Sequence, residues 1–193
     1  MVSPLIREGD RASLIRRVTA MHRLWDLVVS DLTLEHVNHH ERTGVLPIAF
    51  TVLHYVTGED RTAADLLDAG PVLWDEYASR IRAVGNPPRR GTPIAEAEQV
   101  RVGDVVAWRG YQSAVFQRTE TALEAISPER LGQPLFRDGP PPTFETTFLA
   151  MLVGPHGAPT VFDALEAWVY QHGIRHAGEL EHARALVGLR GLT

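Results

Sequence analysis

Hydrophobic positions recur every three or four residues through most of this chain, which is the spacing of the buried face of an amphipathic helix. In the first such segment, Leu14, Val18 and Met21 mark the apolar face. No stretch shows the strict alternation of apolar and polar residues that is typical of a half-buried strand. The expected helices cover about residues 10–34, 47–67, 72–81, 93–126 and 160–188, with a short apolar piece at 148–153.

Glycine and proline separate these segments. Gly132–Pro142 is too rich in both residues to form regular structure. Thr160 is a good N-cap for the last helix, and Asp163 places a negative charge in its first turn, where the helix dipole favours one. Four substantial helices with long, irregular connections predict an all-α fold of the four-helix-bundle type. At this length, one domain across residues 1–193 is expected.

The most informative polar residues are His172 and His176, which continue the apolar stripe of the last expected helix. Residues four apart lie on the same face of a helix, with Cβ atoms about 5–6 Å apart. Two imidazoles at this spacing can bind one metal ion, and a buried imidazole needs a polar partner. His54, which lies midway along the second helix beside an inward-facing leucine, is the best candidate for a third ligand.

The remaining histidines are weaker candidates. His182 follows His176 by six residues, which turns it about 240° away around the helix, and His156 lies in a glycine-proline turn. His36 and His40 have the i, i+4 spacing, with His39 and Glu41 alongside, but they fall where the first helix is expected to end. We therefore expect this group to lie on the surface, and a second metal site is the alternative.

Composition excludes several kinds of chemistry. The chain has no cysteine, so it has neither thiolate metal ligands nor a cysteine nucleophile, and it has no lysine for Schiff-base formation. A net charge of −5 with scattered arginines gives no nucleic-acid-binding footprint. We expect a cytoplasmic protein with a small-molecule substrate and no membrane or nucleic-acid partner. Exposed aromatic residues such as Trp74 and Tyr77 could serve a homodimer interface.

Catalytic motifs of other enzyme classes are absent. No serine lies in a G-x-S-x-G elbow, and no G-x-G-x-x-G or Walker loop occurs. The residues between His172 and His176 are Gly173, Ile174 and Arg175, so the pair differs from the H-E-x-x-H motif of metalloproteases, which carries a glutamate base.

Two segments together resemble the DinB/YfiT-like superfamily: LPIAFTVLHYVTGEDR in the second helix and WVYQHGIRHAGELEHARALVGLRG at the C-terminus. The resemblance extends over essentially the whole chain. It implies a four-helix bundle in which His54, His172 and His176 hold a divalent metal, often zinc or nickel. Some members of this superfamily are transferases or isomerases that use a low-molecular-weight thiol such as mycothiol, bacillithiol or glutathione.

The leading hypothesis is therefore a metal-dependent enzyme of the thiol-dependent transferase or isomerase type. The alternatives are a non-catalytic metal- or ligand-binding stress-response module and a metal-dependent hydrolase. Glu179 could flank the site, although a solvated surface side chain is the expected outcome. Glu59 and Asp60 are expected to cap a helix or form salt bridges, and we expect Asp60-Arg61 to be structural.

Overall fold

The computed structural model describes residues 5–85, 87–154 and 156–192, and this part of the chain is all-helical, as predicted. Within these residues, β pairing is limited to two isolated bridges, Val84 with Arg101 and Pro134 with Thr160. Among the helices that the structure describes, none combines the length and the apolar character needed to cross a bilayer.

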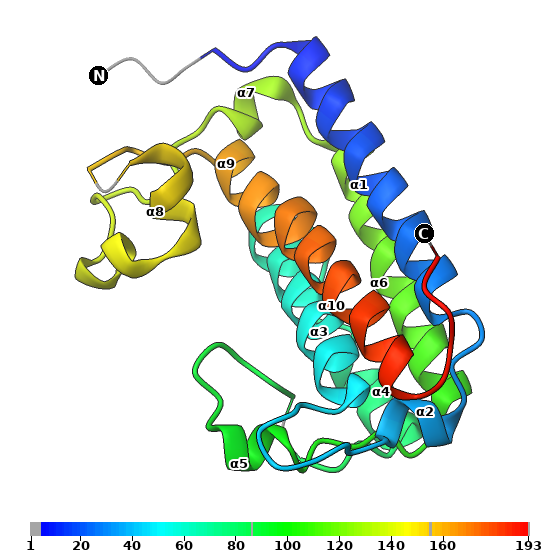
Figure 1. Ribbon diagram of the computed structural model, residues 1–193. Coiled ribbons are helices and arrows are strands. Elements are labelled where there is room, and N and C mark those ends of the chain that lie inside the picture. Colours follow the sequence, from blue (N-terminus) through cyan, green and yellow to red (C-terminus); the bar gives the residue numbers. More distant parts are fainter. Residues whose placement is uncertain (1–4, 86, 155, 193) are drawn as a thin grey trace.

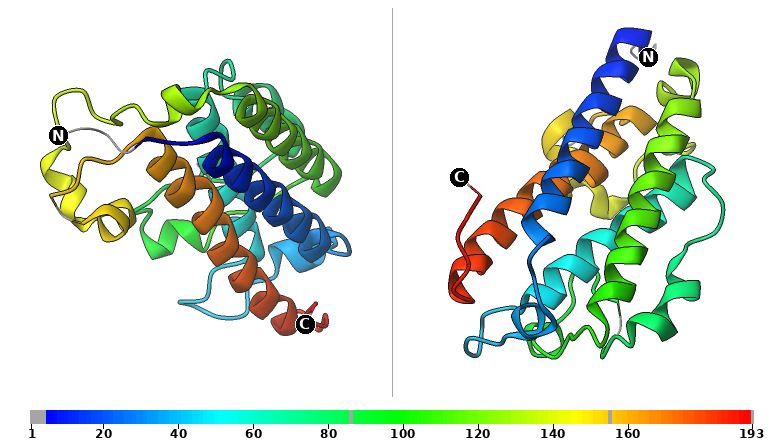
Figure 2. Two further views of the ribbon diagram at one scale, coloured as in Figure 1. Left: turned by 90° about the horizontal axis from the view of Figure 1, so that it is seen from above. Right: turned by 90° about the vertical axis from the view of Figure 1, so that its right-hand side faces the viewer.

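Four long helical segments lie side by side and enclose the main core (Figures 1 and 2). The segments are α1 (Glu8–Val29), α3 (Ile48–Leu66), α6 (Val105–Ala125) and a continuous last segment composed of α9 (Val161–Leu165), the π-helical turn η2 (Glu166–Gln171) and α10 (His172–Leu186). Helix α1 packs on α6 and α10, and α3 packs on the same two helices.

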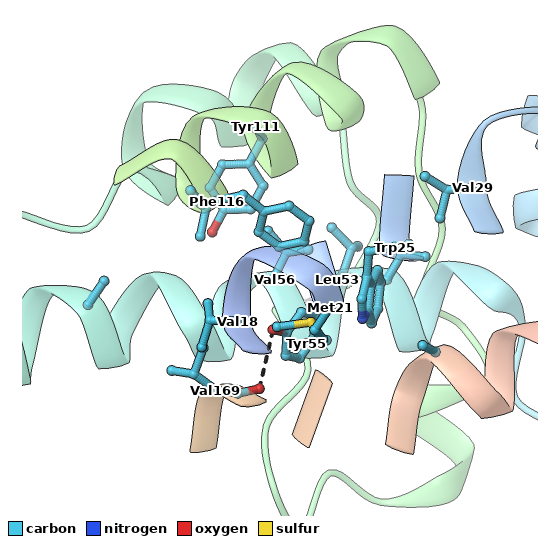
Figure 3. Packing of buried hydrophobic residues seen from close by; sticks show 14 of the residues in the cluster. Val18, Met21, Trp25, Val29, Leu53, Tyr55, Val56, Tyr111, Phe116 and Val169 are labelled. Atoms are coloured by element: carbon cyan, nitrogen blue, oxygen red, sulfur yellow. Dashed lines mark hydrogen bonds between the residues drawn. The ribbon is translucent and has the colours of Figure 1, made fainter. Parts of the chain in front are cut away.

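Aromatic side chains fill the centre of this core (Figure 3). The rings of Trp25 and Tyr55 stack with their centroids 4.4 Å apart, and Phe116 meets the Trp25 ring edge-on at 6.4 Å. The Trp25 indole N–H donates to the backbone oxygen of Gly173 at 2.9 Å, so its one polar group is satisfied in the apolar interior. These contacts connect α1, α3, α6 and α10 with one another in the centre of the core.

The first helix is shorter than the sequence predicts. It ends at Val29 rather than near residue 34, and a separate short helix, α2 (Leu34–Asn38), follows. Two interactions account for the break. The Thr33 hydroxyl accepts a hydrogen bond from the His36 backbone N–H and so starts α2. The Arg109 guanidinium donates to the backbone oxygens of Val29 and Ser30 at 2.8 and 3.0 Å, which adds a partner for the carbonyls at the end of α1.

The segment expected as one helix over residues 93–126 is two helices. A single turn, α5 (Ile94–Ala97), is followed by a loop, and α6 begins only at Val105. The Asp104 carboxylate caps α6 by accepting from the Val106 and Ala107 backbone N–H groups. Gly103 permits the tight loop before it, because a Cβ there would lie 2.6 Å from the Arg82 backbone oxygen.

Trp74 and Tyr77 are less exposed than the sequence suggested. Both lie on α4 (Trp74–Ile81), which packs along α6, and both are half-buried. Each ring lies 5.5 Å from the ring of Tyr111 on α6. Because α4 is amphipathic and turns its aromatic face toward the core, these side chains stabilise the fold and offer no evidence for a dimer.

A smaller apolar cluster lies beside the start of the last segment. The sequence predicts no regular structure over Gly132–Pro142; residues 132–141 form no helix, but Pro142 begins the 3₁₀ turn η1. The short helix α8 (Phe148–Val153) follows and packs against α9 and η2 (Figure 1). Phe144, Leu149 and Ala167 belong to the buried part of this cluster. The short elements here are α7 (Pro128–Leu131), η1 (Pro142–Thr146) and α8 (Phe148–Val153).

Candidate metal centre

The structure brings His54, His172 and His176 together. His54 lies in the middle of α3, and the other two occupy the first and fifth positions of α10, one turn apart on one face. The last segment starts as the sequence predicts: the Thr160 hydroxyl accepts from the Asp163 N–H, and the Asp163 carboxylate accepts from the Thr160 N–H. This capping box fixes the entry of the helix that carries two of the three histidines.

The buried stripe of the last segment differs from the predicted one. The most deeply buried positions near the site are Leu165, Val169, Gly173 and Ala177, whereas Trp168, His172 and His176 are only half-buried. The π-helical turn Glu166–Gln171 precedes His172 directly. Such a turn is often found at functional sites. The histidine face of α10 therefore lies beside the core rather than within it, and it borders a cavity.

The ring nitrogens of the three histidines point toward one another. The Nε2 atoms of His172 and His54 are 3.3 Å apart, and those of His176 and His172 are 2.8 Å apart. One potential ligand atom from each residue lies within 4.8 Å of the others, so the three can hold a metal ion. Two nitrogens bound to one tetrahedral zinc at about 2.05 Å would be about 3.3 Å apart. A small opening of the His172–His176 pair reaches that geometry.

Both His54 and His172 favour the neutral form that binds metal. Burial lowers the pKa of His172 to about 3, and the neighbouring imidazoles of His176 and His54 act in the same direction. Burial and His176 also lower the pKa of His54. Near neutral pH, both rings therefore have a free nitrogen lone pair. Three closely spaced acceptor nitrogens cannot all be satisfied by one another, and a bound cation would satisfy them together.

Groups around the histidines orient their rings. The Nδ1 atom of His176 lies 2.6 Å from a Glu179 carboxylate oxygen, and this hydrogen bond is the main cause of the lowered pKa of Glu179. The Nδ1 atom of His54 lies 3.4 Å from the Pro88 backbone oxygen. Glu179 was expected to be a solvated surface residue. Its side chain is indeed 59% exposed, but it also contacts the site, which the spacing of three residues along the helix permits.

A cavity of about 720 Å³ opens at the three histidines. This volume lies in the range of about 300–1,000 Å³ that is typical of small-molecule sites. One wall is formed by α3 and α10, and the other by α8 and by the loop before α5, which lie on the same side of the molecule in Figure 1. The segment Gly132–Pro142 supplies no lining residue. The lining residues are His54, Gly58, Thr62, Arg90, Thr147, Phe148, Met151, Ala167, Trp168, His172, Arg175 and His176.

The other histidine candidates lie outside this site, as expected. His182 and His156 are exposed. His36 lies in α2, whereas His40 follows the end of that helix, so the i, i+4 geometry of this pair does not form. His39 pairs instead with Glu41 at 3.1 Å on the surface.

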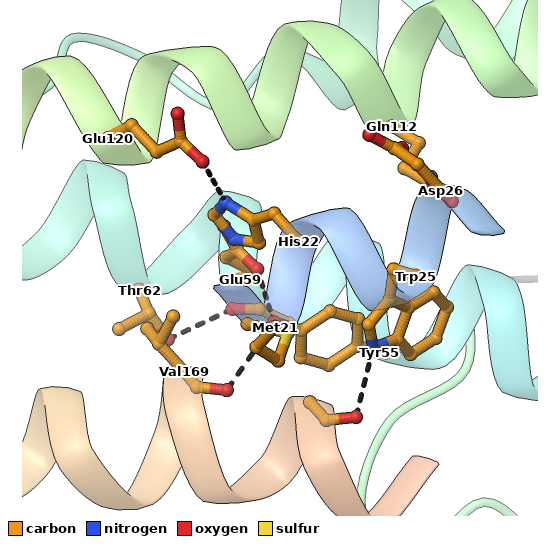
Figure 4. A network of polar contacts seen from close by, with 12 residues as sticks. Met21, His22, Trp25, Asp26, Tyr55, Glu59, Thr62, Gln112, Glu120 and Val169 are labelled. Carbon is orange, nitrogen blue, oxygen red and sulfur yellow. Dashed lines mark hydrogen bonds and ion pairs between the residues drawn. The ribbon is translucent and has the colours of Figure 1, made fainter. Parts of the chain in front are cut away.

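Sequence reasoning missed a buried polar network around His22 (Figure 4). The two ring nitrogens of His22 lie 3.0 Å from a Glu59 carboxylate oxygen and 2.7 Å from one of Glu120. The Tyr55 hydroxyl donates to the other Glu59 oxygen at 2.5 Å. Glu59 is fully buried, and the network joins α1, α3 and α6. The available signal in the sequence was the position of His22 next to Met21 on the apolar stripe of the first helix, since a buried histidine needs polar partners.

Asp60 has the structural role expected of it, but with another partner. Its carboxylate accepts hydrogen bonds from the Leu73 and Trp74 backbone N–H groups at 3.1 and 2.9 Å and from the Tyr111 hydroxyl at 2.8 Å. It also forms an ion pair with Arg118 of α6, rather than with the adjacent Arg61. Asp60 is completely buried and fixes the start of α4 against α3 and α6.

Comparisons with known proteins bear on the fold of this chain and not on its chemistry. No family model matches the chain, and no curated protein matches it. The structure is similar to a crystal structure described as a conserved protein of locus from Enterococcus faecalis, with a TM-score of 0.69 and 14% sequence identity. The similarity covers 92% of this chain and 96% of that one. An experimentally determined protein thus has a similar fold over nearly its whole length.

Proposed function

We propose that this chain is a DinB/YfiT-like four-helix-bundle protein and a metal-dependent enzyme of the thiol-dependent transferase or isomerase type. One observation carries the proposal: three imidazole nitrogens converge at the wall of a cavity large enough for a small substrate. A site with three protein ligands leaves at least one coordination position for a further ligand, as in catalytic rather than structural zinc sites.

The donor set agrees with zinc or nickel, since neutral imidazole suits both. A divalent metal bound here would lower the pKa of a coordinated water or thiol and so supply a nucleophile near neutral pH. The chain contains no cysteine, so any thiol has to come from a cosubstrate.

The protein's own residues would prepare the site. The Glu179 carboxylate holds the His176 ring with Nδ1 facing outward and Nε2 facing the other histidines. Phe148 and Trp168 line the cavity with apolar surface, which reduces access of water to the reacting groups. His54 comes from a different helix, so the site depends on the packing of α3 against α10.

The direct test of the site is the metal content of protein purified without a polyhistidine tag. We expect about one divalent ion per chain in the wild type, and loss of that ion in His172→Ala. The matched control is His182→Ala, because His182 is an exposed histidine of the same helix. Stoichiometric metal in the His172→Ala protein would show that the site is wrong.

The activity is tested with a panel of thiols and electrophilic substrates on the metal-loaded protein. We expect thiol consumption that requires both the metal and His54. Turnover without any thiol would instead indicate a hydrolase that uses bound water. Absence of turnover with every thiol, despite stoichiometric metal, would indicate a binding module.

A further inference from the structure

The cavity beside the three histidines has a positive lining. Two arginines, Arg90 and Arg175, contribute to its wall, and no carboxylate belongs to the described lining. They come from separate parts of the chain: Arg175 lies on α10 between the two metal-binding candidates, and Arg90 lies in the loop before α5. The cavity is therefore electrostatically suited to an anion, although the chain as a whole carries a net charge of −5.

Arg175 is held in place without being neutralised. Its guanidinium carbon lies 4.4 Å from the centroid of the Phe148 ring on α8, a cation–π arrangement that leaves its N–H groups available. Among the described residues it forms no ion pair within hydrogen-bonding range, although its charge is one of the influences that lower the pKa of Glu179. The aromatic contact fixes the position of the positive group at the cavity wall.

Arg90 also uses only some of its hydrogen-bond donors within the protein. One of its terminal nitrogens donates to the backbone oxygen of Thr146 at 3.0 Å, which ties the loop before α5 to the end of η1. A guanidinium has five N–H donors, so most of them remain for a ligand. No carboxylate of the described chain pairs with it.

The rest of the wall is apolar and spacious. Phe148, Met151 and Trp168 present ring and thioether surface, and Met151 as a whole residue is 76% exposed. Gly58 faces the His172 ring. Because it has no side chain, it leaves the space beside this ring open; an added Cβ would lie 3.6 Å from the ring. The apolar body of a ligand would cover this surface, which is otherwise exposed to water.

We propose that the cavity binds a small organic carboxylate with an apolar or aromatic body, and that Arg90 and Arg175 determine this specificity by binding the carboxylate. The inference rests on the proposed function only in placing the reacting end of this molecule at the three-histidine site. Arginine suits the role because its planar fork matches the two oxygens of a carboxylate.

The test compares 3-phenylpropanoate with 3-phenylpropanamide, which have the same body but differ in charge. Dissociation constants are measured by ligand-observed NMR for zinc-loaded and zinc-free wild-type protein. We expect the carboxylate to bind about tenfold tighter than the amide in both forms, the size of effect that one charge-assisted contact gives. Arg175→Gln and Arg90→Gln should each remove most of this preference, whereas Arg175→Lys should keep part of it.

Arg23→Gln is the matched control, because Arg23 is exposed on α1, does not line the cavity and carries the same charge. It should leave the preference unchanged. Equal binding of the two probes, or a preference that survives both glutamine variants, would overturn the inference even if zinc binds. If zinc does not bind but the arginine-dependent preference persists, the proposed function fails and the carboxylate site stands.

Discussion

At the scale of single residues, the candidate ligands differ in what holds them. His172 is kept neutral by burial and by its two histidine neighbours, which lower its pKa to about 3. His176 instead contacts a partly exposed carboxylate, Glu179, at 2.6 Å. A carboxylate that accepts from the outer nitrogen of a metal-bound imidazole fixes the ring and makes it a stronger ligand. Glu179 thus supports His176 as a ligand, although its side chain is mostly exposed.

We predict that Glu179→Gln weakens metal binding by about tenfold, the lower end of the effect of removing such an outer contact, because solvent partly replaces the carboxylate. Competition of the protein with a chromogenic chelator for zinc measures this change. Glu76→Gln is the matched control, since Glu76 is an exposed carboxylate of α4. Equal zinc affinities of wild type and Glu179→Gln would show that the contact does not support the site.

At the scale of helices, close approach of α10 to α1 and α3 positions the histidines. Gly173, next to His172, is the point of contact: a Cβ there would lie 2.4 Å from the Met21 sulfur and 2.6 Å from the Tyr55 hydroxyl. A side chain at this position would displace Met21 and Tyr55 or push α10 outward. Gly178, on the same helix, has nothing within 4 Å of an added Cβ.

The two glycines are therefore predicted to respond in opposite directions to alanine. Gly173→Ala should lower the free energy of unfolding by about 1–3 kcal/mol through overpacking, and should also weaken zinc binding. Gly178→Ala should raise the free energy of unfolding by about 0.5–1 kcal/mol, because alanine is the better helix former. Urea titrations of both variants test this pair, and equal stabilities would contradict the close approach of the helices.

A second helix-scale prediction concerns His22, which joins α1 to α3 and α6. Burial by itself lowers the pKa of this ring, but the Glu59 charge and the hydrogen bonds of both Glu120 and Glu59 raise it to about 9. A raised pKa means that the folded state binds the proton more tightly than the unfolded state. The stabilisation is complete below about pH 6.5 and is lost as the pH rises through 9.

We expect the wild type to lose up to about 3 kcal/mol of unfolding free energy between pH 6.5 and 9.5 through this group. The His22→Gln variant should lack this pH-dependent loss, and His182→Gln, at an exposed site, should retain it. Urea unfolding at both pH values gives the comparison. The same pH dependence in His22→Gln and wild type would mean that another group is responsible.

At the scale of the whole molecule, the site joins parts of the chain that are distant in sequence. His54 and His172 are 118 residues apart, yet their Nε2 atoms are 3.3 Å apart. The cavity wall also needs α8, where Phe148 contacts Arg175 of α10, and the loop before α5, where Pro88 contacts His54 of α3. A metal ion bound here would hold α3 and α10 together and would bind the folded state alone.

Zinc is therefore predicted to stabilise the protein as a whole. At a free concentration 100 times the dissociation constant, it should add about 2.7 kcal/mol to the free energy of unfolding. His54→Ala should abolish this increase, whereas His36→Ala, which changes an α2 histidine outside the site, should preserve it. Chemical unfolding with and without zinc decides between these outcomes, and stabilisation of the His54→Ala protein would contradict the role of His54.

Much of the helical framework could be predicted from periodicity, including the second helix and the Thr160 start of the last one. The errors lie at helix ends, where capping groups outweigh the periodic pattern. Thr33 and Asp104 are local caps that start α2 and α6, whereas Arg109 reaches the end of α1 from a distant part of the chain. The spacing of His172 and His176 predicted their common face, because that depends only on helical geometry.

The sequence by itself determined the helical class, the absence of cysteine thiolates in the chain and the identity of three histidines able to meet. Only the tertiary structure decided where that histidine face points. The sequence pattern predicted that this face lies in the core. In the structure, the neighbouring face with Val169 and Gly173 packs into the core, and the histidines border a cavity. The reason is physical: periodicity fixes which residues share a face, whereas long-range packing, here around the π-helical turn, fixes what each face meets.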